Sequence, residues 1–236
     1  MLCSARAGRA KQAGQALLPT DLSPARLRRA HRANALVLSL FLAAHVATHI
    51  AGIAGVACHL AMLERFRPLY RGVFPETALI GLLALQAGLG VALVLARGRP
   101  RGGWAWLQVL SGGYLLFFLV QHVPAVLMAR LHQPPVDTNS YFAAAFLMGA
   151  PFSYYFAPYY ALALAALLTH LAAALRFALY RVTVPLWLRF VPVLGLGTGI
   201  AVVAGLAGFW RPVMLPDAYE AYLRAWALWF WPQVGR

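Results

Sequence analysis

Five apolar blocks, each about 20 residues long, limit what this chain can fold into. A block of that length crosses the hydrocarbon core of a bilayer, about 30 Å thick, as a helix. Backbone polar groups must be satisfied within each segment in lipid, and no block alternates as a barrel strand would. The sequence therefore predicts an all-α integral membrane protein with five transmembrane helices in an antiparallel bundle. We expect the spans at 34–57, 76–96, 107–130, 154–180 and 189–210.

The segments outside the spans are too short for a soluble catalytic domain, so residues 28–210 are expected to form one membrane domain. Residues 1–27 lack the apolar core of a signal peptide and are expected to be a disordered basic tail. Residues 211–236 contain an aromatic-rich segment with a capping pattern at Asp217, which favours a short C-terminal helix in the membrane interface.

Two segments between the blocks are expected at the outer surface. Residues 59–76 mix apolar and charged side chains, as an interfacial helix and turn would. Residues 136–158 are rich in aromatic residues and are broken by Pro151 and Pro158. This second segment is expected to be a surface or re-entrant piece that roofs a site between helices.

The net charge of +14 comes from arginines clustered at the ends of the blocks. The positive-inside rule and anionic lipid head groups account for this pattern, so nucleic acid is not expected as a partner. Of the 20 basic residues, seven fall on one side of the membrane and thirteen on the other, which predicts a cytoplasmic N-terminus. A bacterial inner membrane is the expected location. The basic tail leaves the mitochondrial inner membrane as an alternative.

The titratable groups at depth in the predicted spans are His45, His49, His122 and His170. A polar side chain in lipid is costly and usually serves a function, such as binding a cofactor or lining a pathway. Interhelical hydrogen bonding is the simpler alternative. A transport pathway is disfavoured by the lack of inverted repeats and buried carboxylates. The remaining histidines are expected in tails or loops: His31, His59 and His132.

Two histidines on facing helices can hold a b-type haem through both axial positions of the iron. Counting ~1.5 Å per residue from the span centres places His122 about 6 Å and His49 about 5 Å to the outer side, with His45 near the middle. Either His45 or His49 could therefore face His122. His170 lies slightly to the inner side and needs a partner from another helix, and span two offers Gln86 and no histidine.

Three motifs carry a resemblance to a known family. Span three contains "LQ" at 107–108, a small residue plus glycine at 111–112, and "HV" at 122–123. Span one reads "RRAH" followed by "FLAAH", and span four reads "LLTHLAAALRFAL". In these motifs the chain resembles the single-chain, five-helix cytochrome b membrane anchor of succinate dehydrogenases and fumarate reductases.

The resemblance implies that His45 and His122 ligate an outer haem b, with His49 beside it, and that His170 belongs to an inner site. Gln86 stands where the family has the second-helix histidine of that inner site. Glutamine is a poor ligand for haem iron. One haem b is therefore expected, and the second lacks a family ligand.

In function, the resemblance implies electron transfer between a quinone and partner flavoprotein and iron–sulfur subunits. The active site for succinate or fumarate would lie on a partner chain, so this chain would be a non-catalytic electron-transfer subunit. Related quinol sites use a carboxylate near the outer haem, which makes Glu64 and Glu76 candidates for a quinone site; the alternative is that they are solvated loop charges paired with Arg65 or Arg71. The alternative is a haem-free membrane scaffold or assembly protein with the same helical frame, which Gln86 favours.

Overall fold

The computed structural model describes residues 23–180 and 183–230, and over these ranges it contains helices and no strands. Within these ranges, five helices are long and apolar enough to cross a membrane, which supports the predicted all-α membrane protein. Most of the expected N-terminal tail, residues 1–22, lies outside the described ranges. The long helices are α2 (Pro24–Ala51), α4 (Val73–Arg97), α5 (Gly103–Leu131), α7 (Phe152–Leu179) and α8 (Leu186–Leu206).

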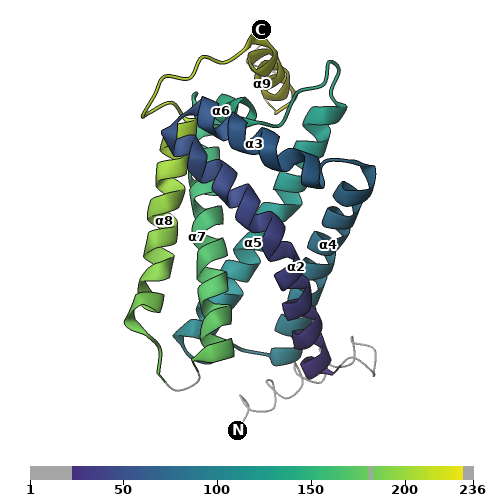
Figure 1. The fold of residues 1–236 in the computed structure, drawn as a ribbon, viewed down its shortest axis with the longest axis vertical. Helices are drawn as coiled ribbons and strands as arrows, with labels where there is room; N and C mark the ends of the chain where they lie inside the picture. The colour runs from purple at the N-terminus through teal and green to yellow at the C-terminus, as the bar shows by residue number, and fades with distance from the viewer. Residues whose placement is uncertain (1–22, 181–182, 231–236) are drawn as a thin grey trace.

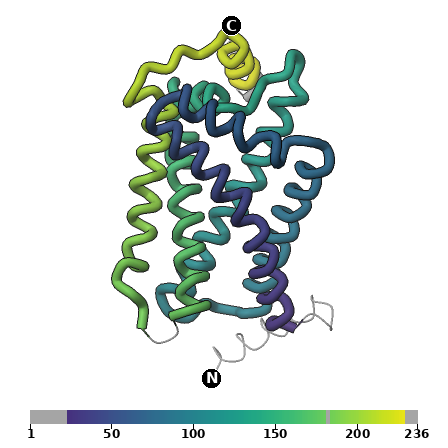
Figure 2. Tube along the Cα trace, in the orientation of Figure 1, coloured from purple at the N-terminus to yellow at the C-terminus, as the bar shows by residue number. Residues whose placement is uncertain are grey.

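Successive long helices run in alternate directions, as the ribbon and the tube show (Figures 1 and 2). Three shorter helices gather at the upper end in these views, which we call the capped end: α3 (Val56–Tyr70), α6 (Ser140–Leu147) and α9 (Asp217–Phe230). At the opposite end, α2 and α5 begin and α4 and α7 finish. We call this the arginine end, after five arginines that line the cavity there: Arg28, Arg32, Arg97, Arg99 and Arg101.

The first helix starts at Pro24 rather than near residue 34. Ser23 caps it, because its side chain accepts a hydrogen bond from the backbone N–H of Arg26 at 3.4 Å, and proline suits the first position of a helix. The expectation that the tail extends to residue 27 is wrong for residues 24–27. As a consequence, His31 is carried by a spanning helix and not by a tail.

The chain reverses after α2 through the short 3-10 helix η1 (Gly52–Ala54) and Gly55. Gly55 has a φ of 123°, a conformation that side-chain-bearing residues rarely adopt. The chain therefore folds back and α3 lies over the capped end, where an interfacial helix was expected (Figure 1).

The segment before the fourth span differs from expectation at Pro158. Instead of breaking the segment, Pro158 lies inside α7, which begins at Phe152 directly after Pro151. A proline removes one backbone hydrogen bond, a loss that neighbouring groups offset in transmembrane helices. The preceding residues form α6, which is largely buried and contributes Phe142 to the cavity lining. α6 thus occupies the predicted roofing position.

α7 and α8 approach each other closely at the small residues of span five. A Cβ atom added at Gly195 would lie 3.2 Å from the Cα of Ala165, and one added at Gly199 would meet the backbone of Ala161. Gly195 and Gly199, which form a GxxxG pair, therefore allow α7 and α8 to pack closely.

Candidate functional site

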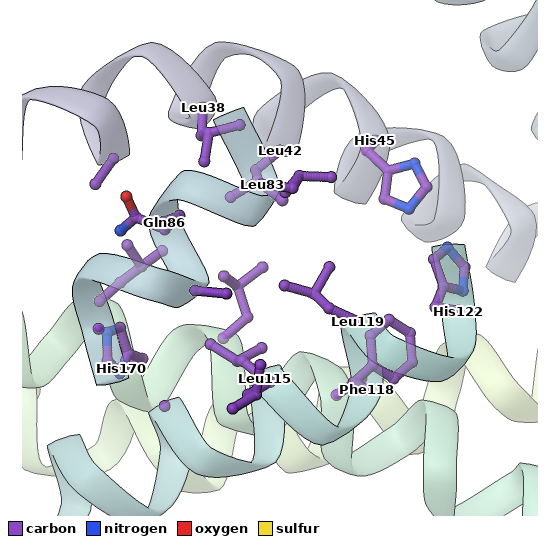
Figure 3. Close-up of a pocket in the computed structure, with 18 of the residues that line it drawn as sticks. Leu38, Leu42, His45, Leu83, Gln86, Leu115, Phe118, Leu119, His122 and His170 are labelled. Atoms are coloured by element: carbon purple, nitrogen blue, oxygen red, sulfur yellow. The ribbon is translucent and has the colours of Figure 1, made fainter. Parts of the chain in front are cut away.

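A large cavity of about 1850 Å³ lies among the long helices. Sites for one drug-sized ligand usually measure about 300–1,000 Å³, so this cavity has room for more than one large ligand. Its middle is apolar, and its polar groups stand at the two ends (Figure 3). His45 and His122 face each other at the capped end, and Gln86 and His170 lie at the other. The apolar middle includes Leu38, Leu42, Leu83, Leu115 and Leu119.

The rings of His45 on α2 and His122 on α5 have centroids 6.1 Å apart and planes at 71°. Each ring stacks on an aromatic neighbour four residues earlier in its own helix, Phe41 at 5.2 Å and Phe118 at 4.8 Å. These contacts restrict ring rotation and keep the two imidazoles aimed into the cavity. Depth along the helix leaves both His45 and His49 as possible partners of His122. In the structure, the ring of His45 faces His122 at this separation.

His49 is paired instead with His59. Nδ1 of His49 lies 3.4 Å from Nε2 of His59, and their ring centroids are 5.2 Å apart. His59 lies outside the spans, as expected, but it is carried by the short helix α3 and its side chain is only 2% exposed. Burial, assisted by the charges of His45 and Arg67, lowers the pKa of His59 to about 4, so the ring is neutral near pH 7.

The sequence feature that could have indicated the contact of His59 with His49 is the pair of glycines between them. Gly52 and Gly55 end α2 just after His49 and allow the chain to turn back. A Cβ added at Gly52 would lie 3.4 Å from Cδ2 of His59, so the glycine also leaves room for the ring. Counting along one helix could not reveal this contact, because it depends on the reversal.

At the arginine end, His170 on α7 is fixed by α5. Nδ1 of His170 lies 3.1 Å from the backbone oxygen of Gln108 and 3.2 Å from Oγ of Ser111. The Ser111 hydroxyl itself donates to the oxygen of Leu107 at 2.6 Å. The Nδ1–H of His170 therefore donates to α5, which leaves Nε2 as the nitrogen available to a ligand.

His31 on α2 is the ring nearest to His170, with centroids 6.4 Å apart and planes at 64°. Nε2 of His31 lies 3.0 Å from Nε2 of Gln86 on α4, and Nδ2 of the buried Asn34 lies 2.8 Å from Oε1 of the same glutamine. Because that oxygen accepts from Asn34, the Gln86 amide nitrogen donates to His31. The early start of α2 thus supplies the second helix that His170 was expected to need.

The two carboxylates considered for a quinone occupy different surroundings. Glu76 lines the cavity at the capped end and pairs with Arg130 at 2.6 Å, both side chains being about one-quarter exposed. Glu64 is exposed and does not line the cavity. Of the two, only Glu76 is in position to act on a molecule inside the bundle.

Within the described ranges, no group of three or more His, Cys, Asp or Glu side chains could hold a single metal ion. Two pairs of cavity-lining histidines, His45 with His122 and His31 with His170, instead have ring centroids 6.1 and 6.4 Å apart, which suits a ligand with two opposed axial positions. Two imidazoles on one iron need ring centres roughly 6 Å apart, since each metal–nitrogen bond is about 2 Å and each nitrogen lies about 1 Å from its ring centre. The residues present at the capped end therefore fit a haem.

Comparisons of the chain with protein-family models, with curated proteins and with solved structures find no match.

Proposed function

We propose that this chain is a membrane-embedded, cytochrome b-like electron-transfer subunit that binds haem b between His45 and His122. The observation that carries the proposal is the 6.1 Å separation of these two rings, which come from different helices and face the same cavity. The neighbouring pair His45 and His49, at 4.7 Å and on one helix, is too close to bracket an iron.

The protein's own part in this function is to position the ligands and exclude water. Phe41 and Phe118 hold the imidazole planes, and leucines and valines around the cavity keep the surroundings apolar. Axial ligand identity and burial are the properties that set a haem's potential. When bound, haem supplies one-electron exchange at its iron.

The electron partners that we propose are a quinone in the membrane and a partner dehydrogenase or reductase, as in the succinate dehydrogenase and fumarate reductase anchors that the sequence resembles. Glu76 is the carboxylate placed to exchange protons with a quinone near the capped end. Its pairing with Arg130 holds the carboxylate in the cavity wall, where a molecule inside the bundle can contact it.

A haem-free scaffold remains the second candidate, and specific contacts favour it. His31, His49, His59 and His170 all lie within hydrogen-bond reach of a polar partner. Such bonds join helices and would keep the frame together without any cofactor.

Purification from haem-replete membranes, followed by a dithionite-reduced minus oxidised spectrum, separates the two functions. We expect a b-type band in the wild type and a loss of at least half of it in His122→Ala. The matched control is His132→Ala, because His132 does not line the cavity and its ring bonds to the oxygen of Pro134. No band in the wild type would leave only the scaffold. An undiminished band in His122→Ala would refute the pairing.

A further inference from the structure

We propose that His31 and His170 form a second bis-histidine haem site at the arginine end of the same cavity, with Gln86 as the partner of His31 in the absence of haem rather than a ligand. This inference rests on the proposed function, since it assigns a second cofactor to the same electron path. It replaces the missing second-helix histidine with a histidine from the first helix.

The ring geometry at the arginine end repeats that at the capped end. The centroids of His31 and His170 are 6.4 Å apart, against 6.1 Å for His45 and His122, and the interplanar angles are 64° and 71°. Both separations match the roughly 6 Å required by two imidazoles on one iron.

The nitrogen atoms are also in the right state to bind a metal. His170 donates its Nδ1–H to the oxygen of Gln108, the arrangement by which a metal-binding histidine commonly fixes its tautomer and leaves Nε2 unprotonated. His31 accepts at Nε2 from the Gln86 amide, so this nitrogen carries its lone pair as well. Without a metal, the Gln86 amide satisfies that lone pair; a metal would take its place.

Two glycines leave space beside these rings. A Cβ at Gly90 on α4 would lie 3.7 Å from Nε2 of His31, and a Cβ at Gly112 on α5 would lie 3.0 Å from Cε1 of His170. Larger residues at these positions would fill the volume next to the ligand nitrogens. Glycine at both points therefore lets the two imidazole rings lie close to the backbones of α4 and α5.

The charge at this end suits an anionic ligand. Five arginines line the cavity there, and no ion pair joins them to a carboxylate within the described part of the chain. The acidic residues that the structure describes belong to α3, α9, the start of α4 and the loop before α6, at the capped end. A haem carries two propionate groups, and arginine binds carboxylates through paired hydrogen bonds.

The cavity can hold both cofactors. His31 and His45 are 14 residues apart on α2, which separates the two sites by about 21 Å along the helix. The volume of about 1850 Å³ is continuous between them. Haems held at both sites would provide an electron relay along the length of the bundle.

Haem content per chain tests this inference. We measure it as the pyridine haemochromogen against protein mass, together with a potentiometric titration of the full-length protein. We expect two haems in the wild type, one in His31→Ala and one in His170→Ala, with the same redox component lost in both. His45→Ala should lose the other component, and His132→Ala should keep both.

A second variant at the same position, His31→Met, distinguishes the loss of a ligand from a folding defect in His31→Ala. His31→Met retains an axial ligand, so we expect two haems and a higher potential for one component only, because methionine in place of histidine raises haem potentials. A wild type with one haem that survives in His31→Ala would overturn the inference and leave the proposed function intact. One haem plus a bound quinone that His31→Ala releases would also overturn it. A wild type without haem would refute the proposed function itself.

Discussion

Replacing Gly112 by alanine tests how tightly α5 packs against His170. The added Cβ would lie 3.0 Å from Cε1 and 3.3 Å from Nδ1 of the ring, closer than ordinary contacts. The ring cannot move away without stretching its 3.1 Å hydrogen bond to the oxygen of Gln108. Overpacking of this kind costs about 1–3 kcal/mol.

Gly113 provides the matched control, because a Cβ there meets nothing within 4 Å. Both substitutions gain the same helix propensity, about 1 kcal/mol, so the difference between them isolates the clash. We expect Gly112→Ala to be about 1–3 kcal/mol less stable than Gly113→Ala, or roughly 2–12 °C lower in Tm for a chain of this size. Circular dichroism melts in one detergent measure this difference. Equal melting temperatures would refute the packing argument.

Three further predictions concern stability. Asn34→Ala removes a buried side chain that donates two hydrogen bonds to α4, at 2.9 and 2.8 Å. We therefore expect the free energy of unfolding to fall by about 1–3 kcal/mol in denaturant titrations. The control is Ser39→Ala, whose hydroxyl donates to the backbone within α2 and which should change that free energy by less than about 0.5 kcal/mol. Burial would raise the pKa of Asp137, but the hydrogen bonds and charges of Arg67 and Arg71 outweigh it and lower that pKa below 3.8. The ionised carboxylate therefore stabilises the fold above about pH 5, and this stabilisation is lost as the pH falls below 3.8. Asp137→Asn should therefore cost up to about 1 kcal/mol at pH 7, and melts from pH 7 to pH 3 should show less pH dependence than in the wild type; an identical pH profile would contradict the pairing. Gly199→Ala forces a Cβ into the backbone of α7 and should cost at least about 1–3 kcal/mol in thermal melts, whereas Gly197→Ala, with nothing within 4 Å, should not destabilise.

The spans could be predicted from the sequence because bilayer thickness fixes their length and hydropathy marks them. The start of the first helix could not be predicted from hydropathy. Residues 24–33 are rich in arginine, and their helix depends on the cap at Ser23 and on packing of Leu27 and Asn34, which are 2% and 7% exposed. This helical extension is what brings His31 into the bundle.

For the candidate site, counting residues along single helices gave the depth of each histidine but not its neighbours. His45 and His49 lie on the same face of α2, so depth alone left both open as partners of His122. The choice depends on α3, which folds back and pairs its His59 with His49. Likewise, the sequence alone shows Gln86 only as a missing ligand, whereas in the structure it donates a hydrogen bond to His31 of another helix. Both contacts are tertiary and have no periodic signature in the sequence.

The most direct test of the central claim is the low-temperature electron paramagnetic resonance spectrum of the oxidised, full-length protein. Two imidazoles on one ferric iron give a low-spin signal, and rings twisted toward the perpendicular, as at 71° for His45 and His122, make that signal strongly anisotropic. We predict such a signal in the wild type, with a component that is lost in His122→Ala and retained in His132→Ala. A wild-type spectrum with no low-spin ferric haem would contradict the account.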